Sequence, residues 1–217
     1  MEKKFDALFT EWNKGICPGG QVLVRKDDKI IYKKNFGYAD LENKIPVTDD
    51  TVFHIASVSK QVAVFCIMLL HEDGKLDIDH DIRKYIPDLV NFEEPVTIRN
   101  MINNVSGIRD QWALLMQTGV RIKDSITQKD ALSLIAKQKH LNFKPLAEYL
   151  YSNSNFTLLA EIAERVSGKS LNEFATERIF KPLNMNKTFF KDSYRKRVPN
   201  LALSYFNIDR EKYAYEP

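Results

Sequence analysis

The hydrophobic pattern near the start of the chain changes from helical to strand spacing. Four apolar residues recur at i, i+3, i+4 and i+7 and predict one stripe on a helix: Phe5, Leu8, Phe9 and Trp12. Glycines and a proline between residues 15 and 20 end that helix. Two runs rich in β-formers, 21–26 and 29–36, then flank Asp27-Asp28, and this arrangement predicts a β-hairpin.

From residue 57 to about residue 190 the pattern is mostly helical. Residues 57–72 form a nearly all-apolar segment of good helix formers, which predicts a helix buried on most sides. The polar stretch 39–50 before it contains a proline and is expected to be a loop. Residues 201–208 look strand-like. Shorter helices are predicted over 97–103, 127–138, 154–166 and 170–181, two of them opened by capping boxes, Thr127 with Asp130 and Ser170 with Glu173.

Composition and charge are those of an ordinary globular protein. A chain of 217 residues is long enough to bury a core. Its residues are 44% apolar and 28% charged, the usual proportions for a globular protein. The net charge is only +3, from 32 basic and 29 acidic residues, so no nucleic-acid partner is indicated. The longest apolar run, 62–70, is shorter than the about 20 residues that a membrane span needs. No secretory signal opens the sequence, so we expect a cytoplasmic protein unless a leader has been removed.

A serine followed three residues later by a lysine, Ser57 and Lys60, opens the most apolar predicted helix. A serine hydroxyl needs a base to act as a nucleophile, and a buried lysine one turn away can become one by desolvation. The free N–H groups of a helix N-terminus would stabilise an oxyanion there. The alternative is an ordinary N-cap serine with an exposed lysine behind it. The same spacing recurs at Ser193 and Lys196 in a highly charged stretch, so spacing alone is a weak signal.

Tyr151-Ser152-Asn153 is a second candidate motif. A tyrosine close to an ammonium group has its phenolate favoured and can serve as a base or proton shuttle. The asparagine side chain offers both a donor and an acceptor to a substrate amide. The alternative is a half-buried aromatic residue at a helix start, and a similar pattern occurs at Tyr205-Phe206-Asn207.

The two motifs belong to an ordered series along the chain. The series comprises 54–60, 97–108, 141–145 and 151–153, with further matches at 18–20, 36–40 and 167–171. In order and spacing it resembles the superfamily of serine β-lactamases, penicillin-binding proteins and esterases, in its class C-like branch. The resemblance runs from about residue 5 to the end of the sequence.

The resemblance implies roles for four residues. Ser57 would be the acylated nucleophile, Lys60 would activate it, and Tyr151 would relay protons to and from the leaving group. Asn153 would hold the substrate. The reaction would be hydrolysis of an amide or ester, such as a β-lactam, a D-alanyl peptide or a small ester. The family uses no metal, and no other cofactor is expected.

The fold implied by the resemblance is α+β, of the β-lactamase/transpeptidase type. Residues 1–54 would supply the helix and hairpin of the sheet region. Residues 55–190 would form the helical region that carries both motifs, and 191–217 would begin the return to the sheet.

The sequence departs from the family at two points. It has no Lys-Thr-Gly or His-x-Gly, which a late strand supplies in the family, so we expect an incomplete sheet and either a fragment or a natural short form. Leu146 stands where the family usually has glycine, which would strain a left-handed turn. A rival hypothesis is therefore a non-catalytic relative that binds a ligand or partner. Besides a small-molecule or peptide substrate, the expected partners are a second copy or a complementing C-terminal segment.

Cysteines and histidines give no further site. Cys17 and Cys66 exclude a disulfide framework and are expected to be small apolar fillers. The four histidines form no close ligand pair, so no metal site is expected at them: His54, His71, His80 and His140.

Overall fold

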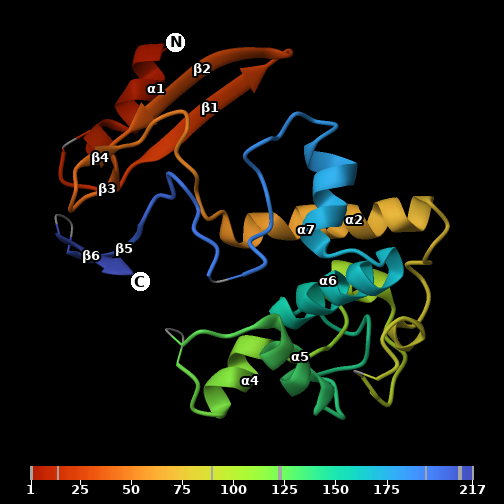
Figure 1. Ribbon diagram of the computed structural model, residues 1–217. Coiled ribbons are helices and arrows are strands. Elements are labelled where there is room, and N and C mark those ends of the chain that lie inside the picture. Colours follow the sequence, from red (N-terminus) through yellow and green to blue (C-terminus); the bar gives the residue numbers. More distant parts are fainter. Residues whose placement is uncertain are drawn as a thin grey trace. The chain divides into compact units, whose positions relative to one another are not determined.

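The computed structural model describes residues 2–13, 15–88, 90–121, 124–193, 195–209 and 212–216. The chain divides into two compact units, the first made of Met1–Ile55 with Tyr194–Pro217 and the second of Ala56–Ser193. Figure 1 shows the strands and the N-terminal helix in the first unit and the other labelled helices in the second. The candidate motifs at 57–60 and 151–153 both fall in the second unit.

The predicted hairpin is confirmed in the first unit. Strands β1 (Gly20–Lys26) and β2 (Lys29–Phe36) pair antiparallel. The turn between them has φ of 47° at Asp27 and 61° at Asp28. A two-residue turn with both residues left-handed matches the twist of paired strands, and aspartate tolerates this conformation better than most residues do.

The N-terminal helix is shorter than its apolar spacing predicts. Helix α1 (Glu2–Leu8) is followed by a 3-10 turn, Thr10–Asn13. Leu8 is 72% exposed and does not join the predicted stripe. The ring of Phe9 lies 5.2 Å, between centroids, from Trp12 and also from Phe36 of β2, so the change of helix type turns these rings toward the hairpin.

The remaining strands of the first unit form two more small sheets. The expected loop at 39–50 is partly wrong, because β3 (Tyr38–Asp40) pairs there with β4 (Ile45–Pro46). The strand predicted over 201–208 corresponds to β5 (Ser204–Asp209), and its partner β6 (Lys212–Glu216) was not predicted. Each sheet among the described residues has two strands.

The second unit is helical. Its main helices are α2 (Ser59–Glu72), α3 (Ile98–Ile102), α4 (Gln111–Gln117), α5 (Gln128–Ala136), α6 (Asn153–Ser167) and α7 (Leu171–Ala175), which continues as a π-helical turn over Thr176–Phe180. Short 3-10 turns cover Ala56–Val58 and Ile82–Lys84. The predicted capping boxes at Thr127 and Ser170 are confirmed, while α4 was not predicted.

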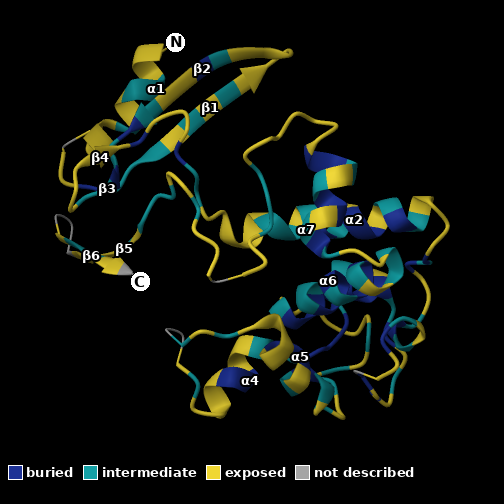
Figure 2. Ribbon diagram, in the orientation of Figure 1, coloured by how far each residue is buried: buried dark blue, intermediate teal, exposed yellow. Residues whose placement is uncertain are grey.

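The core of the second unit lies between α2 and α6. Cys66, Ile67 and Leu70 of α2 are fully buried, as are Leu158 and Ile162 of α6. Figure 2 shows buried stretches along both helices. Burying side chains of this size contributes about 1.5–3 kcal/mol each, so this contact holds the two motif-bearing segments together.

Helix α2 is nevertheless less buried than its composition predicts. Phe65 is 47% exposed and Met68 is 38% exposed within the chain, so the expectation of burial on most sides is wrong for this face. Within the described residues, no helix has the length and apolar character that crossing a membrane requires.

Both cysteines are buried thiols, as expected for apolar fillers. Burial raises the pKa of the Cys66 thiol to about 12. A thiol of this kind stays protonated at neutral pH and is a poor nucleophile.

Candidate active site

The site begins at the turn that leads into α2. Ser57 lies in the 3-10 turn Ala56–Val58 and is exposed, and α2 itself begins at Ser59. The Lys60 Nζ donates a hydrogen bond to the Ser57 Oγ at 2.9 Å. Ser57 therefore precedes the helix rather than capping it, since Val58 holds the N-cap position without a side-chain bond.

The backbone just before Ser57 is unusual. Ala56 has a φ of 45°, a left-handed conformation that is uncommon for residues other than glycine. Its carbonyl oxygen accepts a hydrogen bond from the Ser59 Oγ at 2.7 Å, which helps hold this turn. Left-handed residues of this kind cost about 1–3 kcal/mol and persist where surrounding contacts determine them.

Tyr151 reaches the same serine from a distant part of the sequence. Its hydroxyl donates to the Ser57 Oγ at 3.1 Å, across a separation of 94 residues. The Lys60 Nζ lies 5.2 Å from the centroid of the Tyr151 ring and 5.3 Å from that of Phe156. Three of the four expected site residues therefore meet at one oxygen, with the ammonium group close to two aromatic rings.

The site is open. Ser57 is exposed, Lys60 is half-buried, and Tyr151 is 42% exposed, so the turn at Ser57 does not meet the condition of burial under which a lysine becomes a base by desolvation. Desolvation raises the pKa of the Tyr151 phenol, but hydrogen bonds with Lys60 and Ser57 and the Lys60 charge together lower it by more. The net pKa of Tyr151 lies below the usual value for tyrosine.

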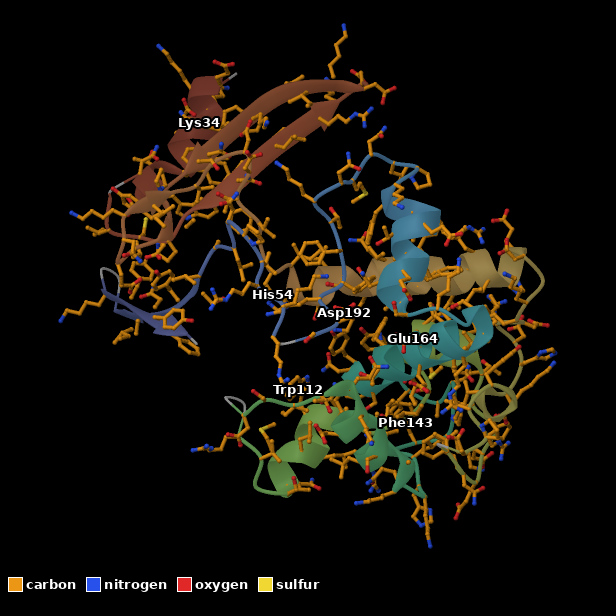
Figure 3. The ribbon with its side chains drawn as sticks, viewed as in Figure 1. Lys34, His54, Trp112, Phe143, Glu164 and Asp192 are labelled. Carbon is orange, nitrogen blue, oxygen red and sulfur yellow. The ribbon has the colours of Figure 1, made fainter. Side chains whose placement is uncertain are left out.

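Asn153, the fourth expected residue, is the first residue of α6, and its hydrogen bonds go to Asp110. Its backbone N–H and its Nδ2 both donate to the Asp110 Oδ2, at 2.6 and 2.8 Å. Asp110 also caps α4 by accepting from the backbone N–H of Trp112, which Figure 3 labels. Sequence reasoning missed Asp110, although an aspartate before a run of helix formers is an N-cap signal.

A buried polar network lies beneath the Tyr151 loop. The Asn104 Oδ1 accepts from the backbone N–H of Ser152 at 3.2 Å and from the Asn155 Nδ2 at 3.1 Å. The Ser106 Oγ donates to the Asn155 Oδ1 at 2.7 Å. All four side chains are buried, and these bonds fix the loop that carries Tyr151.

Two left-handed residues hold the loops of this network. Gly107 has a φ of 73°, and a Cβ there would lie 2.1 Å from the Phe143 carbonyl oxygen, so only glycine fits. Leu146 has a φ of 71°, which confirms the expected strain at this position. Its backbone N–H donates to the Val105 carbonyl at 2.8 Å, which ties the loop before Tyr151 to the loop after α3.

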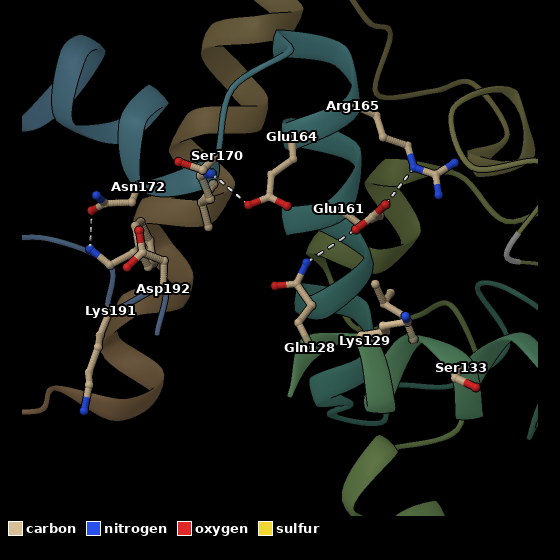
Figure 4. A pocket seen from close by; sticks show the side chains of 13 residues that line it. Gln128, Lys129, Ser133, Glu161, Glu164, Arg165, Ser170, Asn172, Lys191 and Asp192 are labelled. Atoms are coloured by element: carbon tan, nitrogen blue, oxygen red, sulfur yellow. Dashed lines mark hydrogen bonds and ion pairs between the residues drawn. The ribbon is translucent and has the colours of Figure 1, made fainter. Parts of the chain in front are cut away.

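A pocket of about 680 Å³ lies elsewhere in the second unit, between α5, α6, α7 and residues 190–192 (Figure 4). None of the four expected site residues lines it. Several of its polar groups already have partners: Glu161 accepts from Gln128 and Arg165, and Glu164 accepts from the Leu171 backbone N–H. The chemistry of the motifs therefore does not lie in this pocket.

The repeated motifs differ from the candidate site. The second serine–lysine pair spans Tyr194, which lies outside the described residues. The Tyr205 hydroxyl accepts from the backbone N–H of Leu41 and donates to the Glu42 carboxylate, and both bonds lie within the first unit. In the described part of the chain, no group of three or more histidine, cysteine, aspartate or glutamate residues could hold a metal ion.

Comparison with known proteins identifies the relatives. A family model described as "Beta-lactamase" matches residues 5–206. The D-aminopeptidase of Brucella anthropi is 37% identical over 169 residues, covering 77% of this chain and 32% of that protein. Penicillin-binding protein 4* of Bacillus subtilis is 32% identical over 213 residues, covering 98% of this chain and 45% of that protein. This chain thus spans a third to a half of the length of these relatives.

A solved structure gives the same result for the fold. The octameric penicillin-binding protein homologue from Pyrococcus abyssi superposes with a TM-score of 0.80 at 28% identity, covering 99% of this chain and 50% of that one. The expected β-lactamase/transpeptidase-like fold is thereby confirmed, with its sheet present as small fragments. Because the family match extends over nearly the whole sequence, the resemblance is confirmed as well, and the chain belongs to the β-lactamase family.

Proposed function

We propose that this chain is a serine hydrolase that cleaves an amide or ester through an acyl-enzyme formed on Ser57. The observation that carries the proposal is the convergence of Lys60 and Tyr151 on the Ser57 hydroxyl, at 2.9 and 3.1 Å. The names of the relatives, D-aminopeptidase and penicillin-binding protein, support amide chemistry of this kind.

In this proposal Tyr151 is the proton acceptor and Lys60 is the charge that favours its phenolate. Both side chains donate to the Ser57 Oγ in the structure, so the assignment rests on the pKa of Tyr151, which hydrogen bonds and the Lys60 charge lower and which thereby favours loss of the phenol proton. Lys60 thus activates Ser57 indirectly, by stabilising the base and by orienting the serine oxygen.

The proposed reaction has two halves. In the first, Ser57 transfers its proton to the Tyr151 phenolate while its Oγ forms a bond to the substrate carbonyl carbon. Tyr151 then gives that proton to the leaving nitrogen or oxygen, and the scissile bond breaks. In the second half, water gives a proton to the Tyr151 phenolate while its oxygen bonds to the ester carbonyl carbon; Tyr151 then returns that proton to the Ser57 Oγ as the bond between Oγ and the carbonyl carbon breaks, and the acid leaves.

The position of Ser57 also supports stabilisation of the oxyanion. The 3-10 turn and the first turn of α2 bring backbone N–H groups and the positive end of the helix dipole to this residue. Removing one pre-positioned donor from an oxyanion site of this kind slows the reaction by about 10²–10³.

Labelling with a fluorophosphonate tests the proposal. We expect one adduct on Ser57, and we expect Ser57→Ala to abolish it. Ser193→Ala, in the second serine–lysine pair, is the matched control and should label like the wild type. A folded chain that takes no label would instead support a non-catalytic member of the family.

A further inference from the structure

The Lys60 ammonium group faces two aromatic rings at nearly equal distances. Its Nζ lies over the Tyr151 ring, 5.2 Å from the centroid, and over the Phe156 ring, 5.3 Å from the centroid. The two centroids are 6.4 Å apart. The electron-rich face of an aromatic ring attracts an ammonium group within about 6 Å of its centroid, so both rings hold this cation.

The two rings take the place of a carboxylate partner. In the described part of the chain, no aspartate or glutamate forms an ion pair with Lys60, and its Nζ donates to the Ser57 Oγ at 2.9 Å. A carboxylate at this position would place a negative charge beside the Tyr151 phenol and disfavour its phenolate. A ring attracts the ammonium group without adding a charge, so the full charge of Lys60 remains available to Tyr151.

The helix and the core set the position of Phe156. This residue is the fourth of α6, is half-buried, and packs against the hydrophobic core of the second unit. Tyr151, in contrast, precedes the helix and is 42% exposed. The Phe156 ring therefore offers Lys60 a fixed surface, on the side of the ammonium group that the phenol does not supply.

We propose that Phe156 is a positioning residue of the candidate active site: the face of its ring holds the Lys60 ammonium group against the Ser57 oxygen and beside the Tyr151 phenol. The inference rests on the proposed function at Ser57, because Phe156 acts only through Lys60. It predicts that the electron density on the face of this ring, and not its size alone, decides how readily Ser57 reacts.

Fluorinated phenylalanines in place of Phe156 test this inference on the full chain. Each added fluorine withdraws electron density from the ring face and weakens its attraction for a cation, while the shape of the side chain changes little. The readout is the rate at which a fluorophosphonate labels Ser57 at neutral pH, for the mono-, di- and trifluoro forms. We expect a stepwise fall that reaches about two- to fivefold with three fluorines, the effect of losing one cation–π contact at a partly exposed site.

Titration of the Tyr151 phenol, followed by carbon-13 NMR at its Cζ, gives a readout that does not depend on activity. Desolvation raises the pKa of Tyr151, as does the Asp110 charge. Hydrogen bonds with Lys60 and Ser57, and the Lys60 charge, lower it. Fluorination of Phe156 loosens only Lys60, so the pKa of Tyr151 should rise with each fluorine, and labelling should require a higher pH. In Lys60→Met, which has no ammonium group, fluorination should leave this pKa unchanged.

Phe174 provides a matched control for the fluorinated series. Its ring centroid lies 5.6 Å from the guanidinium carbon of Arg178, which is a contact of the same kind within the second unit. Trifluorophenylalanine in place of Phe174 should label like the wild type. Phe156→Leu keeps an apolar side chain without a ring face and should label no faster than the trifluoro form. A purely structural role of Phe156 would leave the fluorinated series flat, because fluorination preserves the packing.

The outcomes separate this inference from the proposed function. A labelling rate or a Tyr151 pKa that stays constant across the series overturns the inference while labelling of Ser57 stands. A rise of this pKa that persists in Lys60→Met, or an equal loss of labelling on fluorination of Phe174, overturns it as well. Absence of labelling in the wild type overturns the proposed function and the positioning role with it.

Discussion

Replacing Tyr151 with phenylalanine isolates the contribution of one hydroxyl group. The change removes the 3.1 Å hydrogen bond to the Ser57 Oγ and the group that we propose as the base. It keeps the ring that lies 5.2 Å from the Lys60 Nζ and 6.4 Å from the Phe156 ring. The side chain is 42% exposed, so packing around it changes little.

The magnitudes of the two effects differ widely. One hydrogen bond contributes about 0.5–1.5 kcal/mol to stability, and partial exposure places this one at the low end. A positioned general base contributes about 10²–10⁴ in rate, equivalent to about 2.7–5.4 kcal/mol of activation free energy. We therefore expect Tyr151→Phe to unfold almost as the wild type does while acylating Ser57 at least about a hundredfold more slowly.

The assay is the acylation rate of Ser57 followed against pH. Because the phenolate is the active form, the wild-type rate should rise as pH approaches the lowered pKa of Tyr151 from below, and the variant should lose this rise. Tyr149→Phe, at a neighbouring tyrosine that is 69% exposed, is the control and should match the wild type. A Tyr151→Phe rate within threefold of the wild type, with its pH dependence intact, would refute the role of the phenol.

Two further predictions concern the loops that carry the site. Leu146→Gly should raise the free energy of unfolding by about 1 kcal/mol, since it relieves a left-handed leucine that is 74% exposed; a lower urea midpoint would contradict this. Gly107→Ala should destabilise the chain by about 3 kcal/mol or more, because its Cβ would meet the Phe143 carbonyl oxygen at 2.1 Å. Thermal unfolding followed by circular dichroism measures that loss, and an unchanged melting temperature would show that this loop rearranges freely.

Features set by neighbouring residues could be predicted from the sequence. The Asp27-Asp28 turn and the capping boxes at Thr127 and Ser170 depend on side chains within three residues of each other, and all three are present. The β3–β4 pair and helix α4 were missed because tertiary contacts, more than local preference, decide them.

The candidate site could not be predicted from the spacing of hydrophobic residues alone. No spacing rule brings Tyr151 to Ser57 across 94 residues, and that pair was anticipated only through the resemblance to a family. Asp110 was missed because its importance depends on the folded chain bringing it to Asn153. The exposure of Phe65 on α2 shows that an all-apolar segment need not be buried on every side.

The most direct test of the central claim is the mass of the chain, and of its peptides, after brief incubation with a thioester substrate and acid quenching. Our account predicts a single acyl group per chain, carried by the peptide that contains Ser57. Acylation spread over several serines, or confined to a peptide without Ser57, would contradict it.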